Sequence, residues 1–379
     1  MYPHAKLAYL LSLSVFSYAP FLYAANKPTS LEELSDAIQE LEQKVGMTAA
    51  MAGNGGSNTV MQPSKTHLGG YGELHYNNLD SGSEIDFHRF VLFIGHKFSD
   101  RIRLHSELEM EHSIAGEGQN GEVELEQAYI DIDINDNATV RTGLFLIPVG
   151  IINETHEPPV FYGVERNPVE NNIIPATWWE GGVGVNGELA PGWGYDVAVT
   201  SGLESTDYRP RGGRNKVSEA SAENLAYTGR VKWTGMPGTE IAATIQLQDD
   251  ITQETDPTAG SATLFETHAI VNRGPATVKV LYAAWDLDGT GPASVGRDEQ
   301  TGWYVEPSYK VIEKVGVFVR YNEWDNDAGS ASTAGTKRKQ TNIGANYWPH
   351  EDVVFKFDLL DQGGAIDDEG FNLGVGYQF

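Results

Sequence analysis

Ionisable side chains occupy every second position between residues 101 and 111. The series is Arg101, Arg103, His105, Glu107, Glu109 and Glu111, and the positions between them are mostly apolar. Carboxylates and imidazoles close to one another can exchange protons, and with a serine they can form a hydrolytic triad. No spacing in the chain singles out a serine and histidine pair for that reaction. We therefore predict no catalytic residue and expect the series to face water.

Such a series requires β-strands with one polar and one apolar face, because side chains alternate across a strand. Two-faced segments begin near residues 67, 83, 101, 121, 138, 180, 193, 224, 239, 261, 275, 299, 314, 337, 351 and 369. Short and long connections alternate between them, as in outer-membrane barrels with short periplasmic turns and long outer loops. The predicted fold class is all-β, a 16-stranded antiparallel transmembrane β-barrel preceded by a short periplasmic coiled-coil helix.

The polar faces of the strands are assigned to the lumen, since a lysine or arginine facing hydrocarbon near the bilayer centre costs about 2–4 kcal/mol. Sixteen strands enclose a space too wide for wall side chains to fill, which predicts an aqueous channel. The predicted pore-lining residues are Arg89, Arg101, Arg103, Glu107, Glu109, Arg141, Arg230, Lys232, Arg320 and Lys356.

Composition narrows the function further. The chain has 53 acidic and 26 basic residues and a net charge of −27, which argues against a nucleic-acid partner because duplex binding needs a basic surface. Cysteine is absent, so disulfides and thiolate metal sites are excluded. Acidic loops such as "DDITQETD" could collect Ca²⁺ or Mg²⁺, but no complete EF-hand loop is present, and solvated loops are the simpler interpretation. No cofactor and no metal site is predicted.

The first 24 residues have the features of a secretory signal. Lys6 precedes an apolar stretch from Leu7 to Phe16, and small residues follow at Ala24 and Ala25. The alternative, a single membrane anchor, is weakened by Pro20 and by serines that interrupt the stretch. Together with the barrel pattern, the signal predicts the outer membrane of a Gram-negative bacterium, with outer-membrane lipid as a partner.

The spacing of apolar residues within residues 25–46 predicts a heptad helix and therefore a periplasmic coiled coil. Its seam is Leu31, Leu34, Ile38, Leu41 and Val45. This seam predicts a homo-oligomer, although Ile38 and Val45 at a positions favour parallel dimers; an amphipathic helix on the protein's own surface is the alternative. Residues 47–66 are expected to be a flexible linker, and residues 67–379 the barrel.

A set of positions between residues 85 and 190 carries a family resemblance. The positions are Arg89, Gly95, Tyr129, Gly143, Phe145, Pro148, Gly150, Glu165, Arg166 and Pro175. In them the chain resembles the outer-membrane porins grouped with the phosphate-selective porins O and P. The resemblance implies a trimeric channel with a long third loop inside the lumen. It also implies that the terminal Phe379 is the assembly signal read by the barrel-assembly machinery.

The longest connection, Pro148–Trp179, is expected to narrow the pore. Its apolar residues would be costly to leave in water, so we expect it to fold inward; packing on a neighbouring subunit is the alternative. The predicted constriction residues are Glu165, Arg166 and Glu180.

The sequence leaves the sign of ion selectivity open. In the resembled family an arginine commonly follows the proline of the third loop, whereas here Pro175 is followed by "ATWWEGG". The function predicted is a porin for passive diffusion of small hydrophilic solutes and ions. The alternatives are a channel selective for anions, phosphate or sugar, and a barrel that anchors the outer membrane through its stalk.

Overall fold

The computed structural model describes residues 65–331 and 335–379. The expected signal segment, the heptad helix with its seam and nearly all of the linker lie outside these residues. Within the described ranges, no helix is both long and apolar enough to cross a bilayer.

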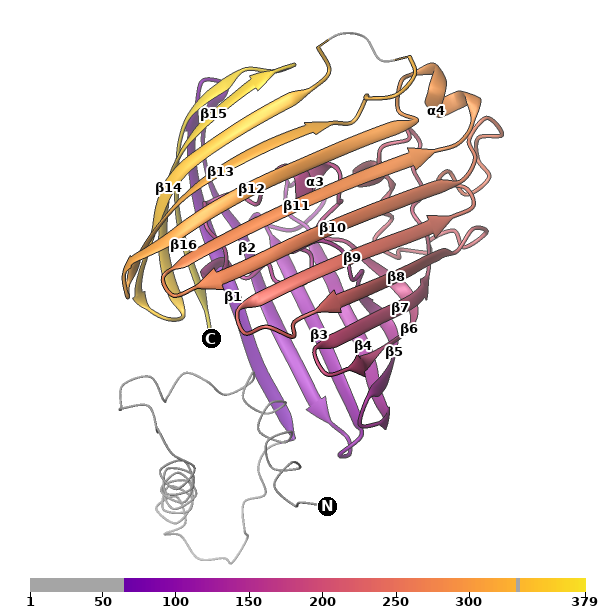
Figure 1. Cartoon of the computed structure of the whole chain (residues 1–379), viewed down its shortest axis with the longest axis horizontal. Helices are drawn as coiled ribbons and strands as arrows, with labels where there is room; N and C mark the ends of the chain where they lie inside the picture. The colour runs from indigo at the N-terminus through magenta and orange to yellow at the C-terminus, as the bar shows by residue number, and fades with distance from the viewer. Residues whose placement is uncertain (1–64, 332–334) are drawn as a thin grey trace, which may run out of the picture. The chain divides into compact units, whose positions relative to one another are not determined.

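Sixteen antiparallel strands in the described ranges close into one barrel, in which β1 pairs with β16 (Figure 1). The first eight are β1 (Thr66–Leu79), β2 (Gly82–Lys97), β3 (Ile102–Glu111), β4 (Val123–Asn135), β5 (Ala138–Leu146), β6 (Trp179–Ala190), β7 (Trp193–Thr200) and β8 (Ala226–Trp233). The others are β9 (Thr239–Gln248), β10 (Ala262–Arg273), β11 (Ala276–Leu287), β12 (Glu299–Ile312), β13 (Val315–Asp325), β14 (Arg338–His350), β15 (Val353–Gly364) and β16 (Asp368–Gln378). Every predicted strand start lies within two residues of the observed one, so the barrel prediction is confirmed.

Alternation along the strands separates the inside of the barrel from the outside. On β15, Phe355 and Phe357 are exposed, whereas Lys356 and Asp358 are almost fully buried. Apolar side chains therefore form the outer surface, where hydrocarbon would surround them, and ionisable ones turn inward. The C-terminal Phe379 completes the closure, because its main-chain N–H and C=O both hydrogen-bond to Gly70, at 2.9 and 3.0 Å.

Connections differ in length at the two ends of the barrel. The seven turns from an even to an odd strand have two to five residues, whereas six of the eight described connections from an odd to an even strand have eleven or more. In outer-membrane barrels the end with long loops faces the outside of the cell. Two of these long connections matter for the site: the third loop, residues 147–178, and the fourth loop, residues 201–225.

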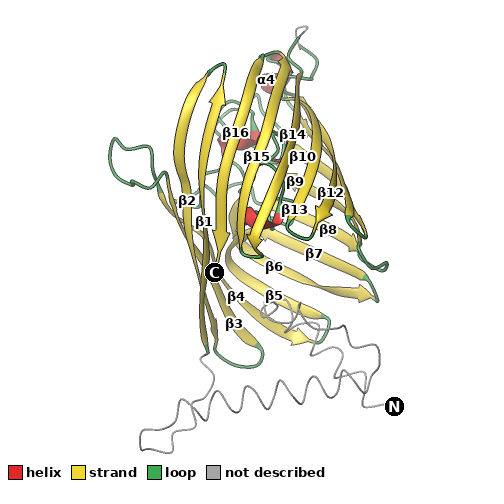
Figure 2. Ribbon diagram, turned by 90° about the vertical axis from the view of Figure 1, so that its left-hand side faces the viewer, coloured by secondary structure: helices red, strands yellow, loops and turns green. Residues whose placement is uncertain are grey.

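The third loop folds into the lumen, where its short helices η2 (Pro158–Val160) and α3 (Val169–Asn172) lie inside the ring of strands (Figure 2). It forms a buried apolar cluster with the barrel wall, which includes Ile147, Val149, Ile151, Val169, Ile173, Ile174, Trp178, Leu264, Leu281, Trp285, Tyr304 and Trp324. Hydrogen bonds fix it as well, for example from Trp285 Nε1 to the Ile173 carbonyl at 2.8 Å. The loop thus fills part of the lumen with a buried apolar core.

Candidate functional site

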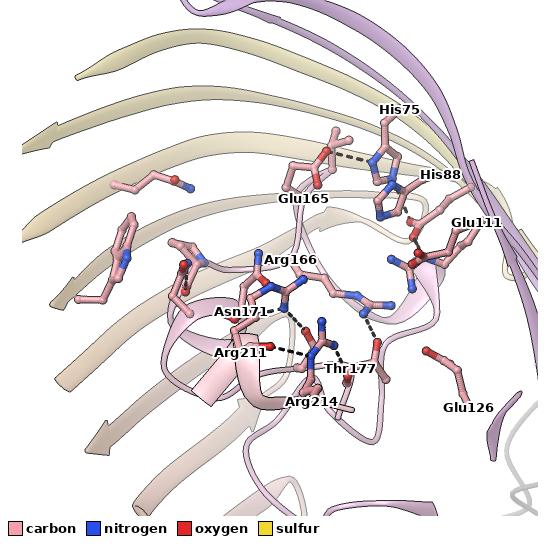
Figure 3. Close-up of a pocket in the computed structure, with 18 of the residues that line it drawn as sticks. His75, His88, Glu111, Glu126, Glu165, Arg166, Asn171, Thr177, Arg211 and Arg214 are labelled. Atoms are coloured by element: carbon pink, nitrogen blue, oxygen red, sulfur yellow. Dashed lines mark hydrogen bonds and ion pairs between the residues drawn. The ribbon is translucent and has the colours of Figure 1, made fainter. Parts of the chain in front are cut away.

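A cavity of about 420 Å³ remains between the third loop, the fourth loop and the barrel wall. Strands β1, β2, β3, β4, β6, β13, β14 and β15 contribute the wall, and most of the lining side chains are polar or charged. Figure 3 shows that the labelled side chains converge on this space from both loops and from the wall. The cavity lies in the lumen beside the third loop.

Three arginines form one side of the cavity (Figure 3). Arg166 of the third loop donates a hydrogen bond to Thr177 Oγ1 at 2.6 Å. Arg211 of the fourth loop donates to the Ala176 carbonyl at 2.9 Å, and Arg214 donates to the Thr177 carbonyl at 2.5 Å. Among the residues that the structure describes, no carboxylate forms an ion pair with any of the three. Their charges are therefore not neutralised by direct contact.

The closeness of these arginines also affects their acidity. Burial, followed by repulsion from Arg214 and Arg166, lowers the pKa of Arg211 to about 10. At neutral pH the guanidinium remains charged, because its pKa is still well above the pH of the solution. The cavity thus keeps a concentrated positive charge on this side.

The fourth loop is held in place from several directions. The Leu203 main-chain N–H donates to Gln248 Oε1 at 2.9 Å, and Ser205 N–H donates to the Ile251 carbonyl at 2.8 Å. Arg209 forms an ion pair with Asp327 at 3.0 Å. The short helix η3 (Pro210–Gly213) follows and places Arg211 and Arg214 against the third loop.

Carboxylates also line the cavity, and several of those around it have cationic partners. Arg89 contacts Glu73 at 2.8 Å and Glu109 at 3.0 Å. Lys216 of the fourth loop forms ion pairs with Glu122 and Glu124. Glu111 and Glu126 line the cavity as well, without an ion pair to a described arginine or lysine, so the cavity holds unpaired charges of both signs.

Glu165 connects the third loop to the barrel wall. Its Oε1 accepts hydrogen bonds from His75 Nδ1 at 2.9 Å and from Asn77 at 3.0 Å. Burial raises the pKa of Glu165, but the hydrogen bond and charge of His75 outweigh it and lower the pKa to about 2. A shift in the pairing of β1 with β2 next to Glu73 brings both His88 and Arg89 to this side of the wall.

Glu180 lies away from the cavity. It is the second residue of β6, is fully buried, and accepts hydrogen bonds from Trp178 Nε1 at 3.0 Å and from Ser201. Its side chain anchors the end of the third loop, because the buried indole and hydroxyl need an acceptor. Of the three constriction residues predicted from the sequence, the structure places Glu165 and Arg166 at the cavity and Glu180 in the packing behind it.

Most of the predicted pore-lining bases have an acidic partner. The pairs are Arg89 with Glu73 and Glu109, Arg103 with Asp133, Arg141 with Asp131, Arg230 with Asp196 and Glu154, Lys232 with Glu240, and Arg320 with Glu306. Lys356 is buried with its ammonium 3.4 Å from the centre of the Phe161 ring, and Arg101 bonds the carbonyls of Asp133 and Ile134 near a short turn. Glu107 is buried beneath the third loop. These residues contribute less net charge to the solute path than their number suggests.

Sequence reasoning did not identify Arg211 and Arg214. The segment "RPRGGRNK", residues 209–216, holds four bases in eight positions of an otherwise acidic chain. That local excess of positive charge in a long loop was the signal available. The position of this segment in the lumen depends on contacts of the fourth loop with β9 and with the loop after β9. No local sequence pattern reveals these contacts.

Comparisons with known proteins agree with the fold. Residues 69–363 match the family described as phosphate-selective porin O and P, and the chain belongs to this family. A protein of Aquifex aeolicus (strain VF5), described as uncharacterized, is 30% identical over 336 residues, which cover 77% of this chain and 74% of that protein.

Solved structures share the fold at low identity. The outer membrane channel DcaP of Acinetobacter baumannii has a TM-score of 0.59 at 14% identity, covering 83% of this chain and 97% of that one. An anion-selective porin from Comamonas acidovorans has a TM-score of 0.58 at 12% identity, covering 84% of this chain and 100% of that one. The family and the barrel identify this protein as an outer-membrane porin of a Gram-negative bacterium, a channel for small solutes.

Proposed function

We propose that this porin favours small anions over cations, with phosphate as the reference solute. The observation that carries the proposal is the group formed by Arg166, Arg211 and Arg214, which share one cavity without an ion pair to any described carboxylate. The family to which the chain belongs is described as phosphate-selective. The non-enzymatic role is part of the same proposal, since an anion path requires no catalytic residue.

The arginines suit an anion both by charge and by hydrogen bonding. Narrow passages with low-dielectric walls focus the field of the charges that line them. Guanidinium groups also match the oxygens of phosphate geometrically and can donate two parallel hydrogen bonds. The Nε and Nη2 atoms of Arg166 are buried and have no hydrogen-bond partner among the described residues, so contacts within the protein leave part of the hydrogen-bonding capacity of this guanidinium unused.

Reversal potentials under a KCl gradient test this proposal. Arg211→Gln and Arg214→Gln should each shift the reversal potential toward cation preference. Both should weaken the block of chloride current by inorganic phosphate about tenfold, because a hydrogen bond to a charged group contributes about 1.5–3 kcal/mol. Arg273→Gln is the control, since Arg273 is exposed at the short turn after β10 and does not line the cavity. If Arg211→Gln and Arg214→Gln both keep the wild-type reversal potential, the two arginines do not select ions.

We propose that the protein assembles as a homotrimer, in contact with outer-membrane lipid. A trimer form of OmpT from Vibrio cholerae shares the fold, with a TM-score of 0.55 at 12% identity, covering 83% of this chain and 99% of that one. Cross-linking in mild detergent should give a product of three chains. A limit at two chains would favour the dimer preference of the heptad seam. The domain scheme, with residues 1–24 as signal, 25–46 as coiled coil and 47–66 as linker, stays a prediction.

A further inference from the structure

Behind the third loop, three buried side chains from separate elements converge on one point. His156 belongs to the third loop, Glu107 to β3 and Glu126 to β4, and none is more than 3% exposed. The Nε2 atom of His156 lies 3.6 Å from Glu107 Oε1 and 3.7 Å from Glu126 Oε2. The nitrogen and the two oxygens all lie within 4.8 Å of one another.

An irregularity in the barrel wall creates this convergence. In the pairing of β3 with β4, Glu107 lies opposite Gln127 and Leu108 lies opposite Leu125, so Glu126 has no residue opposite it. An extra residue of this kind is a β-bulge, which locally changes the direction of side chains. Here it brings Glu126 and Gln127, although adjacent in sequence, to the same side as Glu107.

Neighbouring hydrogen bonds orient two of the three groups. His156 Nδ1 lies 3.2 Å from the Asn153 carbonyl. A carbonyl can only accept, so Nδ1 carries the proton and the neutral ring has its lone pair on Nε2, facing the carboxylates. Gln127 Nε2 donates to the other oxygen of Glu107 at 2.6 Å. Partners of this kind orient histidine and carboxylate ligands in metal sites.

The distances match a shared ion better than direct hydrogen bonds. N–H···O bonds measure about 2.7–3.2 Å, and Glu107 Oε1 and Glu126 Oε2 have no hydrogen-bond partner in the part of the chain that is described. Two metal–ligand bonds of about 2.1 Å at a tetrahedral angle separate the ligand atoms by about 3.4 Å. We infer that Glu107, Glu126 and His156 bind one divalent metal ion of the zinc type.

A divalent cation neutralises both carboxylates when His156 is neutral. Two further carboxylates, Glu109 and Glu124, lie close to Glu126, but Arg89 and Lys216 pair with them, and the positive charge of Arg166 also acts on His156. The metal assignment therefore depends on the ligand geometry and not on a surplus of negative charge. An ion here joins the third loop to two wall strands and thereby fixes the loop that forms the constriction.

Zinc binding by the refolded full-length protein tests the inference. The chain is refolded from urea with ZnCl₂ in the buffer, so that burial does not prevent access, and bound zinc is measured after dialysis. The wild type should hold one equivalent per chain. Glu126→Gln, Glu107→Gln and His156→Ala should each lose it, and heat-modifiable gel mobility confirms that each variant is folded. The two Gln variants keep the side-chain shape, so the test stands if His156→Ala does not fold.

Two controls separate this site from other histidines. His268 is also buried between two carboxylates, but it contacts Glu266 at 2.7 Å and Glu240 at 3.3 Å directly, so His268→Ala should keep the zinc. His112 belongs to another group of possible ligands with Asp86 and His88. Zinc lost in His112→Ala but kept in Glu126→Gln overturns the assignment. So does a wild type without zinc, or equal zinc in Glu126→Gln.

Discussion

The Arg211 guanidinium donates a hydrogen bond of 2.9 Å to the main-chain oxygen of Ala176. This contact joins the fourth loop to the third, so the charge at the constriction is shared between two loops that are far apart in sequence. Without the fourth loop, the third loop would contribute Arg166 alone, and the other arginines of the cavity would come from the wall, namely Arg89 and Arg338. The proposed anion selectivity therefore depends on how both loops pack.

Glu165 and Arg166 are adjacent in sequence and should have opposite effects on ion preference. Arg166→Gln removes a positive charge from the cavity and should shift the reversal potential toward cations, whereas Glu165→Gln should shift it toward anions. Glu117→Gln, in the exposed loop after β3, is the control and should have a smaller effect. The measurement is the reversal potential in a KCl gradient. If both cavity variants behave as wild type, the constriction assignment must be abandoned.

Acid should release the third loop from the wall only at very low pH. The pKa of Glu165 is lowered from 4.5 to about 2, so its contact with His75 stabilises the loop fully above about pH 4.5 and is lost as pH falls through about 2. Single-channel currents should stay steady down to pH 4 and become noisier near pH 2. Glu165→Gln should lack this change. A transition of equal size in that variant would assign the effect to other groups.

Glu170 is expected to hold the third loop in its folded form. Its carboxylate accepts hydrogen bonds from the Ile151 and Ile152 N–H groups, at 2.7 and 2.6 Å, and from Tyr304 Oη at 2.8 Å. Glu170→Ala leaves these buried donors without an acceptor, at about 1–3 kcal/mol each. Conductance and protease cleavage within the loop should both increase.

The barrel itself should survive this change, because its hydrogen-bond ladder does not involve Glu170. Heat-modifiable mobility is the check for that. Tyr304→Phe removes only one of the donors and should have a small effect, about 1 kcal/mol. Unchanged conductance in Glu170→Ala would show that the loop is held by its apolar contacts alone.

Phe379 offers a way to separate assembly from stability. The residue is 64% exposed, and its two hydrogen bonds to Gly70 use main-chain atoms that any residue provides. Phe379→Ala should therefore refold in detergent as well as wild type. In cells, the amount of folded protein in the outer membrane should fall severalfold if the assembly machinery recognises the ring. If wild type and Phe379→Ala give equal amounts of folded protein both in detergent and in cells, Phe379 is not an assembly signal.

The strands could be predicted because each must have an apolar face toward lipid and a polar face toward the lumen. That requirement produces a period of two residues in the sequence, so even the starts were accurate to within two residues. The β-bulge at Glu126 was not predicted. It is visible in hindsight as a change of phase, since the inward residues pass from Glu124 and Glu126 to Asp131 and Asp133.

The candidate site could be predicted from the sequence less well than the fold. The inward position of the third loop follows from its apolar content, which is a local property of the sequence. The path of the fourth loop depends instead on distant partners, such as the Ile251 carbonyl and Asp327. Glu180 was assigned to the constriction from its sequence position, but its polar partners Trp178 and Ser201 draw it into the packing.

Arg211 and Arg214 rest on main-chain carbonyls of the third loop rather than on its side chains. Every residue type supplies the same carbonyl, so substitutions at Asn171, Ala176 or Thr177 need not remove the acceptors, provided that the backbone keeps its course. Many point mutations in the third loop should therefore leave the positions of Arg211 and Arg214 unchanged. Related channels with different side chains in that loop could still bind both guanidinium groups in the same place.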